Sequence, residues 1–318
     1  MNAMVEKYKG APWLNYVAAP PEPKSLRMLD AVMKKEEAYP LYPGNELLCF
    51  DYTVPEDIAF DDHFMKGTPE GGGLHLYLYK PKAYTGKKWF FYIHGGGFMR
   101  GNGPWCKHNA LALAKELGIN VAACEYHYTP AFKYPVALND VEEAYRYIRD
   151  KMGIEPNNII MGGESAGGTY TMAMAQRLRS QGRPLPSALV NMSAYLDLTL
   201  EGESYTANYG VDPTFTVDMK PTVPFYLADM DLVRNPEVSP IFADVKDYPP
   251  TFFACDETEI FLSCALTSCD KLQKAGVPCE GYITHGFVHV FMFEAPEIPE
   301  SKKFYAELKK FLETHKVI

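Results

Sequence analysis

Residues 157–175 read NNIIMGGESAGGTYTMAMA and decide the fold of this chain. One serine, Ser165, stands between two glycine pairs, at 162–163 and 167–168, after a short apolar run and before a helix-like segment. Glycine inside a helix or strand costs about 0.5–1 kcal/mol relative to alanine. The glycines around this serine therefore indicate a backbone that must bend sharply from a strand into a helix.

The rest of the chain alternates strand-like and helix-like segments. The predicted strands are 74–79, 89–93, 120–125, 158–161, 188–192, 251–255 and 280–284, and the predicted helices are 135–151, 166–180, 260–275 and 299–314. This alternation predicts an α/β fold with a mostly parallel central sheet flanked by helices. Residues 1–60 and about 197–245 break the pattern and are rich in Pro, Tyr, Asp and Met. We expect them to form a cap over the carboxyl ends of the strands, within one domain that spans residues 1–318.

Composition and charge narrow the class of protein. The chain has 318 residues, of which 47% are hydrophobic and 22% charged, so we expect a soluble globular protein with a large core. A net charge of -9 disfavours nucleic acid or an anionic membrane as a partner, because phosphate binding requires clustered Lys and Arg. The charged N-terminal residues lack the apolar run of a signal peptide, so we expect a cytoplasmic protein without membrane insertion. The seven scattered cysteines favour reduced thiols, and the sequence leaves a homo-oligomer open.

A second glycine-rich segment, WFFYIHGGGFMRG at residues 89–101, follows directly from a predicted strand. Glycines leave backbone N–H groups accessible, and those of Gly96 and Gly97 could bind the oxyanion of a tetrahedral intermediate together with that of Ala166. A phosphate-binding loop is the alternative. It would need Gly-Lys-Ser/Thr after the glycines, and a dinucleotide motif would need glycine where Arg100 stands, so both nucleotide interpretations fail.

Ser165 is the centre of a G-x-S-x-G motif that lies between a predicted strand and a predicted helix. In that context the motif indicates a nucleophilic serine; the alternative is a helix-capping serine in a glycine turn. A nucleophilic serine needs a base and a carboxylate that orients the base, in the chain order serine, acid, histidine. His289 is the candidate base. With His285 it could instead form a zinc pair, but Gly286 disfavours the required helix and the glutamate of H-E-x-x-H is absent.

Several further motifs carry a resemblance to a known family. They are HGGGF at 94–98, GESAGG at 163–168, DLT at 197–199, SPIFAD at 239–244, AGVP at 275–278 and G-x-x-H at 286–289. With them the chain resembles, over about residues 70–315, the hormone-sensitive-lipase-like branch of the α/β-hydrolases, which includes bacterial acetyl esterases and short-chain carboxylesterases. The resemblance implies the α/β-hydrolase fold.

The resemblance also identifies the acid. Similar proteins carry a D-P-L-type segment whose aspartate completes the triad. Counting forward from 249–250 and backward from 275–276 places Glu259 at that position, so the acid is predicted to be a glutamate, with Asp256 as the second choice. Glu164 is a comparable departure, because the commoner motif is GDSAGG.

These residues together predict a serine carboxylesterase that hydrolyses short-chain, acetyl-like esters through Ser165, His289 and Glu259 and an acyl-enzyme intermediate. The expected partner is a small-molecule ester, and neither a metal nor an organic cofactor is needed. An amidase, formamidase or peptidase on the same triad remains the alternative, as does a non-catalytic ligand-binding member of the fold. Five aromatic residues of the cap could line the pocket or pack the cap onto the body: Tyr195, Tyr205, Tyr209, Phe215 and Phe225.

Overall fold

The computed structural model describes residues 2–36, 50–69, 71–216 and 218–318. In this part of the chain, nine strands form one sheet in the order β1-β9-β8-β7-β6-β4-β5-β3-β2. The strands are β1 (Leu14–Tyr16), β2 (Ile58–Met65), β3 (Leu74–Pro81), β4 (Trp89–Ile93), β5 (Asn120–Cys124), β6 (Ile159–Glu164), β7 (Ala188–Met192), β8 (Thr251–Asp256) and β9 (Cys279–Thr284). Neighbouring strands are parallel except that β3 runs antiparallel to both β2 and β5. The predicted α/β-hydrolase sheet is confirmed.

The two edge strands, β1 and β2, were not predicted from the sequence. β1 has three residues, too few for a recognisable pattern, and β2 is mostly exposed, with Asp61, Asp62 and His63 interrupting its apolar residues, so neither strand has the apolar signal of the buried strands. Residues 14–16 and 58–60 therefore belong to the sheet and not to a cap, which corrects the expected 1–60 boundary.

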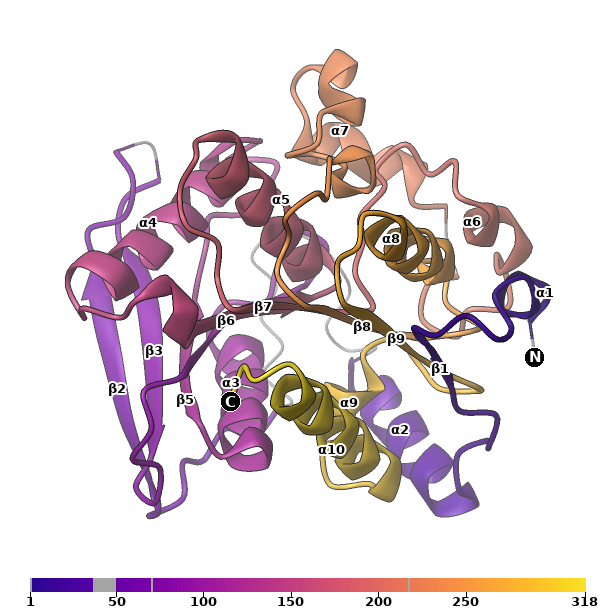
Figure 1. Cartoon of the computed structure of the whole chain (residues 1–318), viewed down its shortest axis with the longest axis horizontal. Coiled ribbons are helices and arrows are strands. Elements are labelled where there is room, and N and C mark those ends of the chain that lie inside the picture. Colours follow the sequence, from indigo (N-terminus) through magenta and orange to yellow (C-terminus); the bar gives the residue numbers. More distant parts are fainter. Residues whose placement is uncertain (1, 37–49, 70, 217) are drawn as a thin grey trace.

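Helices cover both faces of the sheet, as Figure 1 shows. One face carries α4 (Val136–Asp150), α5 (Ala166–Ser180) and α8 (Leu262–Lys274), and the other carries α3 (Pro104–Leu117) and α10 (Pro299–Thr314). The short helix α9 (Phe291–Glu294) and α2 (Pro23–Glu36) lie on the same side as α10. All four predicted helices are present. α3 was not predicted, because its own alanine and leucine residues point to most sides of the helix and leave little amphipathic periodicity.

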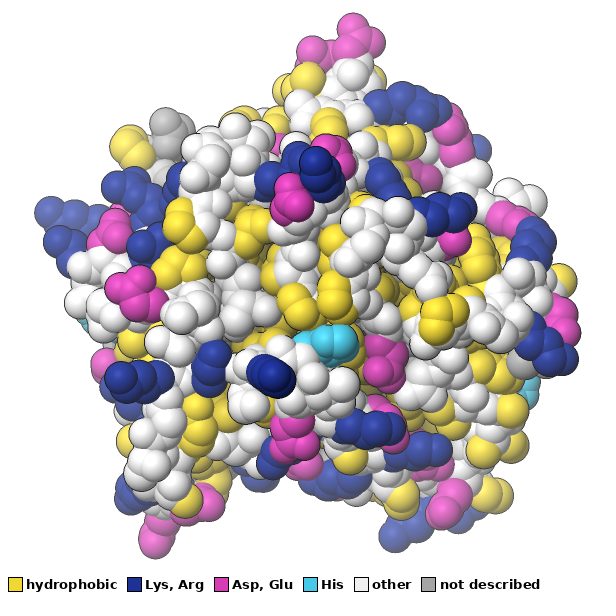
Figure 2. Space-filling model, viewed as in Figure 1, with side chains coloured by type: hydrophobic (Ala, Val, Ile, Leu, Met, Phe, Trp, Pro, Cys, Tyr) yellow, Lys and Arg dark blue, Asp and Glu magenta, His cyan; other side chains and the backbone are white. Residues whose placement is uncertain are grey.

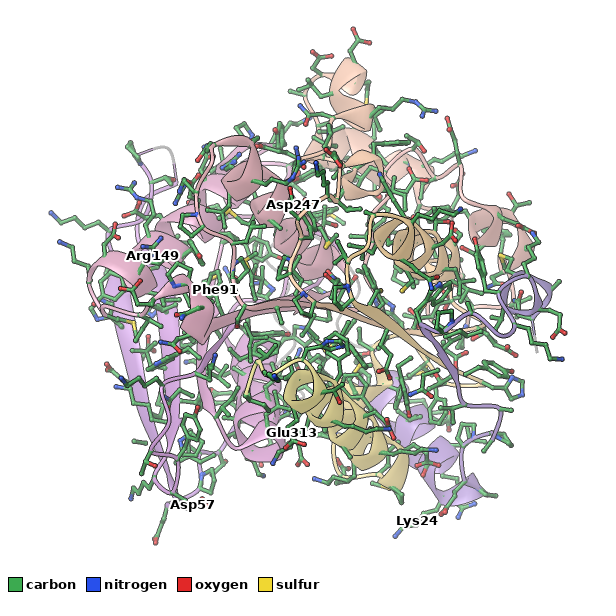
Figure 3. The ribbon with its side chains drawn as sticks, in the orientation of Figure 1. Lys24, Asp57, Phe91, Arg149, Asp247 and Glu313 are labelled. Carbon is green, nitrogen blue, oxygen red and sulfur yellow. The ribbon has the colours of Figure 1, made fainter. Side chains whose placement is uncertain are left out.

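Two hydrophobic clusters, one on each face of the sheet, form the core. Successive side chains of a strand point to opposite faces, so Phe91 and Ile93 of β4 join one cluster whereas Phe90 and Tyr92 join the other. Phe91 is fully buried, and Figure 3 shows it inside the molecule at the level of the sheet. The β4 strand is buried along its whole length, so the glycine loop that follows it starts from a rigid support.

The region 197–245 contains short helices and no strand within its described residues. They are α6 (Glu203–Ala207), η2 (Lys220–Thr222), α7 (Val223–Tyr226), η3 (Met230–Arg234) and η4 (Pro240–Phe242). The segment around α7 projects beyond the helices that cover the sheet (Figure 1). α1 (Ala3–Glu6) lies at the opposite edge from β2. Residues 37–49, which belong to the expected N-terminal cap segment, lie outside the described residues.

The surface carries charges of both signs. On the face shown in Figure 2, Lys and Arg side chains are interspersed with Asp and Glu, without an extended basic area on that face. Among the described helices, none combines the length and the apolar character that crossing a bilayer requires.

Candidate active site

Ser165 occupies the sharp turn between β6 and α5. Its φ is 53° and its ψ is -121°, a strained combination for a residue with a side chain. A Cβ at Gly163 would come within 2.4 Å of the Ile93 carbonyl oxygen, and one at Gly167 within 2.0 Å of the same oxygen. The predicted crowding around this serine is therefore confirmed, and it explains why glycines flank the turn.

The loop that follows β4 lies beside this turn. Gly96 has φ 102° and Gly97 has φ 62°, values that favour glycine. Within the described residues, neither of their N–H groups donates a hydrogen bond, and the same holds for Ala166 at the start of α5. The first N–H groups of a helix have no partner inside the helix. Three backbone donors thus remain available next to Ser165.

The buried Glu164 connects the loop to the turn. Its Oε1 accepts hydrogen bonds from the Gly95 N–H at 2.6 Å and from Trp105 Nε1 at 2.9 Å, and its Oε2 accepts one from the Tyr92 hydroxyl at 2.7 Å. Burial raises the pKa of Glu164 to about 7, although these hydrogen bonds act in the opposite direction. Glu164 therefore fixes the position of the glycine loop relative to Ser165.

His94, at the head of the loop, is held on both sides. Its Nδ1 lies 2.7 Å from the Gly95 carbonyl oxygen and its Nε2 lies 2.7 Å from Asn102 Oδ1. The ring stacks on Tyr126 with centroids 4.2 Å apart. Burial lowers the pKa of His94 to about 4, so the ring is neutral at neutral pH and supports the loop by hydrogen bonding.

The structure brings His289 and Glu259 together. His289 Nδ1 lies 2.6 Å from Glu259 Oε2, and both side chains are buried. The other oxygen of Glu259 accepts hydrogen bonds from the Ser193 hydroxyl and the Asp256 N–H, each at 2.8 Å. Both carboxylate oxygens are thus engaged, and His289 Nε2 is the ring nitrogen left for the pocket.

The electrostatic environment favours the charged form of His289. Burial, the largest single effect, lowers the pKa of the imidazole, but the carboxylates of Glu259, Asp212 and Glu164 together outweigh it, with Glu259 first among them. The net result is a pKa raised above the ordinary value for histidine. A proton accepted by this ring is therefore stabilised.

Asp256, the second candidate acid, has a different set of partners. Its oxygens accept hydrogen bonds from Thr258, from the Thr284 hydroxyl at 2.8 Å and from the Phe287 N–H at 3.0 Å. These contacts hold the ends of two neighbouring strands together. Asp256 forms no hydrogen bond with His289 in the described structure, so Glu259 is the carboxylate that contacts the imidazole.

His285 and His289 contact different glutamates and do not form a metal-binding pair. Its Nδ1 lies 2.5 Å from Glu257 Oε1, and the same glutamate accepts a hydrogen bond from Tyr16. Across the described ranges, no three His, Cys, Asp or Glu side chains are grouped as metal ligands.

Ser165 and His289 face one pocket of about 620 Å³, part of which is open to solvent. It is lined by Glu36, Gly96, Gly97, Arg100, Trp105, Glu164, Ser165, Tyr195, Thr214, Phe215, Met219, Phe261, His289, Val290 and Glu294. Of the five cap aromatics, Tyr195 and Phe215 line this pocket, and the Phe215 ring lies 4.8 Å from that of His289. Tyr209 and Phe225 are instead 55% and 46% exposed.

Sequence reasoning did not find four of the polar or aromatic lining residues: Glu36, Arg100, Trp105 and Glu294. Glu36 ends a helix that was not predicted, and Trp105 lies in the first turn of another. Arg100 and Glu294 each follow a motif that was recognised, at 94–98 and 286–289, and their closeness to those motifs was the available signal.

Comparisons with known proteins show the family of this chain. A family model described as alpha/beta hydrolase fold matches residues 90–293. An esterase from Acinetobacter venetianus is 32% identical over 224 residues, which cover 70% of this chain and 73% of the relative. An acetyl-hydrolase from Streptomyces hygroscopicus is 31% identical over 236 residues, covering 74% and 78%.

The fold is also similar to that of solved structures. The crystal structure of an esterase from the bacterial hormone-sensitive lipase family superposes with a TM-score of 0.81 and 26% identity, covering 93% of this chain and 99% of the other. The chain therefore belongs to the alpha/beta hydrolase fold family, as its resemblance to the hormone-sensitive-lipase-like branch predicted.

Proposed function

We propose that this protein is a serine carboxylesterase that hydrolyses short-chain, acetyl-like esters. Ser165 is the nucleophile, His289 the general base and acid, and Glu259 the residue that orients His289. The observation that carries the proposal is the contact of 2.6 Å between His289 Nδ1 and Glu259 Oε2, behind a pocket that Ser165 lines. The relatives named esterase and acetyl-hydrolase support the same activity.

In the first half of the reaction, Ser165 Oγ attacks the ester carbonyl while His289 Nε2 accepts its proton. Glu259 keeps the Nδ1 proton on the other side of the ring, which leaves Nε2 free to accept. The carbonyl oxygen becomes negatively charged and receives hydrogen bonds from the N–H groups of Gly96, Gly97 and Ala166. Each such donor contributes about 3–4 kcal/mol in the transition state.

The tetrahedral intermediate then collapses to an acyl-enzyme. The bond between the carbonyl carbon and the alkoxy oxygen breaks, and His289 gives its proton to the departing alcohol. In the second half of the reaction, His289 takes a proton from a water molecule, and the resulting hydroxide attacks the acyl carbon. The bond between that carbon and Ser165 Oγ then breaks, and His289 returns the proton to Ser165.

The size of the acyl group follows from the pocket walls. Phe215, Met219 and Phe261 line the cavity that contains Ser165, so a long chain would have to pass between packed aromatic side chains. We expect rates on p-nitrophenyl esters to fall sharply beyond about eight acyl carbons, because a longer chain does not fit between these side chains. Comparable turnover of butyrate and palmitate esters would contradict this.

The decisive experiment measures hydrolysis of p-nitrophenyl acetate and butyrate by purified protein, with and without EDTA. We expect turnover that EDTA does not change and that Ser165→Ala abolishes. Loss of activity on chelation, restored by zinc, would overturn the metal-independent mechanism. If p-nitroacetanilide is cleaved faster than p-nitrophenyl acetate, the protein is an amidase on the same triad.

A further inference from the structure

One segment of the cap, residues 208–215, lies against the backbone of the triad acid. Asn208 and Asp212 are both buried. Asn208 Nδ2 donates a hydrogen bond to the Glu259 carbonyl oxygen at 2.7 Å, and Asp212 Oδ2 accepts one from the Ile260 N–H at 2.9 Å. This carbonyl and this N–H belong to the same peptide group, the one that joins Glu259 to Ile260. The cap therefore binds both polar groups of the peptide bond that follows the acid.

The same segment also contacts the base. Asp212 Oδ1 accepts hydrogen bonds from the N–H groups of Thr214 at 2.8 Å and Phe215 at 3.1 Å. The Thr214 hydroxyl oxygen accepts one from the His289 N–H at 3.3 Å, and the Phe215 ring meets the imidazole edge-on, at an interplanar angle of 73°. One oxygen of Asp212 thus orders a turn whose next residues contact His289, while the other binds the backbone beside the acid.

The charge of Asp212 acts on the triad as well. Its hydrogen-bond partners in the described structure are all backbone N–H groups, which suit an ionised carboxylate because that group only accepts. Burial, followed by the charge of Glu259, raises the pKa of Asp212, whereas backbone N–H groups and the charge of His289 act in the opposite direction. Two buried carboxylates beside one imidazole repel each other, and a proton on the ring relieves that repulsion. Asp212 therefore favours the charged form of His289, as Glu259 does.

Other parts of the fold also present charges to His289. Among the described residues, the carboxylates that interact electrostatically with it are Glu259 after β8, Glu164 at the end of β6, Glu36 at the end of α2 and Asp212 in the cap. Arg100 and Glu294 are the further charged residues that line the pocket. Removing the charge of Asp212 should change the titration of His289, an effect that loss of a merely structural contact does not have.

We propose that Asp212 is a positioning residue of the triad, which fixes Glu259 and His289 from the cap and adds a negative charge beside the imidazole. The inference rests on the proposed esterase function and gives the cap a part in the chemistry of the same site. Asp212 does not line the pocket. It acts by keeping the acid and the base in contact and by stabilising the imidazolium that forms when Ser165 gives up its proton.

The test is Asp212→Asn, which keeps the shape of the side chain. An amide oxygen can still accept from Thr214 and Phe215, but the amide nitrogen would face the Ile260 N–H, so two donors meet and the hydrogen bond is lost. We expect kcat for p-nitrophenyl acetate to fall about tenfold, with KM within about twofold of the wild type. The acid limb of kcat/KM should move to lower pH, because one of the carboxylates that raise the pKa of His289 is gone.

Titration of His289 followed by NMR measures the electrostatic effect without a substrate. The Cε1–H resonance of His289 is assigned by its absence in His289→Gln, and its midpoint should be lower in Asp212→Asn than in the wild type. Thr214→Val is a second variant, which removes the acceptor for the His289 N–H and leaves Asp212 in place. Its kcat should fall about threefold with the NMR midpoint unchanged, so the geometric role is tested even if Asp212→Asn does not fold.

The matched control is Asp197→Asn, at the start of the cap. Asp197 is also buried and also accepts a hydrogen bond from the N–H two residues further on, that of Thr199 at 2.9 Å. In the described structure it forms no hydrogen bond with Glu259 or His289. Its variant should keep kcat within about twofold of the wild type and leave the titration of His289 unchanged, whatever its melting temperature.

The outcomes separate this inference from the proposed function. If the wild type hydrolyses no p-nitrophenyl ester, the proposed function fails, while the NMR titration still tests the effect of Asp212 on His289. If the wild type is active and Asp212→Asn keeps both its kcat and the midpoint of His289, the inference alone is overturned, even when that variant melts at a lower temperature. Equal changes in Asp197→Asn and Asp212→Asn would also overturn it.

Discussion

Two regions that approach Ser165, the loop after β4 and the turn after β8, are each anchored by a buried glutamate. Glu164 holds the loop through the N–H of Gly95, the indole of Trp105 and the hydroxyl of Tyr92, none of which changes its charge at neutral pH. Glu259 holds His289, whose charge can change, as well as Ser193. Two glutamates therefore have different roles in one site.

The difference concerns what each glutamate can stabilise. The partners of Glu164 are neutral donors, so it maintains the shape of the loop in every state of the reaction. Glu259 faces a ring that becomes a cation when it accepts a proton, so its interaction strengthens when the proton moves. We expect loss of Glu259 to impair the chemical step and loss of Glu164 to impair geometry.

The largest effect is expected for Glu259→Gln. An amide cannot stabilise the imidazolium and presents His289 with the wrong hydrogen-bonding pattern, so kcat should fall about 10⁴-fold, as for a triad carboxylate changed to an amide in a serine protease. Steady-state kinetics on p-nitrophenyl acetate measure this.

Asp256→Asn is the matched control, since Asp256 is equally buried but binds the ends of β8 and β9. It should lower the melting temperature and leave kcat within about tenfold of the wild type. If Asp256→Asn abolishes turnover while Glu259→Gln remains active, the acid has been assigned to the wrong residue.

Gly96→Ala should have the next largest effect, on the loop side of the comparison. A Cβ at Gly96 would come within 2.1 Å of the Arg100 carbonyl oxygen, so the backbone must move and displace its N–H. Loss of one oxyanion donor lowers kcat about 10²–10³-fold. Gly182→Ala controls for backbone strain, because Gly182 also has positive φ, 65°, but has open space around it. Equal loss of kcat in the two variants would contradict a specific role of the loop.

The pH profile tests the electrostatic side of the comparison. His289 must be neutral to accept a proton, and its pKa is raised, so wild-type kcat/KM should decline on acidification with a midpoint above the ordinary histidine value. In Glu259→Gln the carboxylate that raises this pKa is gone and burial then dominates. The midpoint of the residual activity should move to lower pH. An unchanged midpoint would show that another group controls the acid limb.

The smallest effect is expected for Glu164→Gln. The amide oxygen can still accept from the Gly95 N–H, so kcat should fall by about tenfold or less. Stability should respond to pH: the folded-state pKa of Glu164, about 7, lies above the unfolded value, so its contribution is lost as pH rises through about 7. Thermal melts should therefore show Glu164→Gln gaining on the wild type between about pH 4.5 and pH 7, the ordinary and the raised pKa of Glu164. A constant difference would contradict the raised pKa.

The sequence predicted the central strands because they are short apolar runs with glycine and proline boundaries, and β4 to β9 are buried almost throughout. It could not predict β1 and β2. Those strands lie at the edges, where one side pairs and the other meets solvent, so little apolar patterning is required of them.

The candidate site divides in the same way. Ser165, the glycine loop and His289 could be recognised because each lies in a turn that requires glycine, and those glycines are visible in the sequence. Glu259 was found by spacing from flanking motifs, and the structure gives the contact that spacing cannot supply. Glu36 and Glu294 lie 258 positions apart in the sequence, and no local pattern relates them. The packing of α2 and α9 brings both to one pocket.

The buried Oε2 of Glu294 has no hydrogen-bond partner in the described structure, which has a consequence for directed evolution of this protein. Replacing a buried acid that has no partner by an apolar side chain of similar length removes a desolvation cost, so a screen for heat resistance would favour substitutions at this position. The variants so obtained would survive higher temperature, but the substituted side chain would line the pocket that contains Ser165. A screen for heat resistance should therefore measure ester hydrolysis as well.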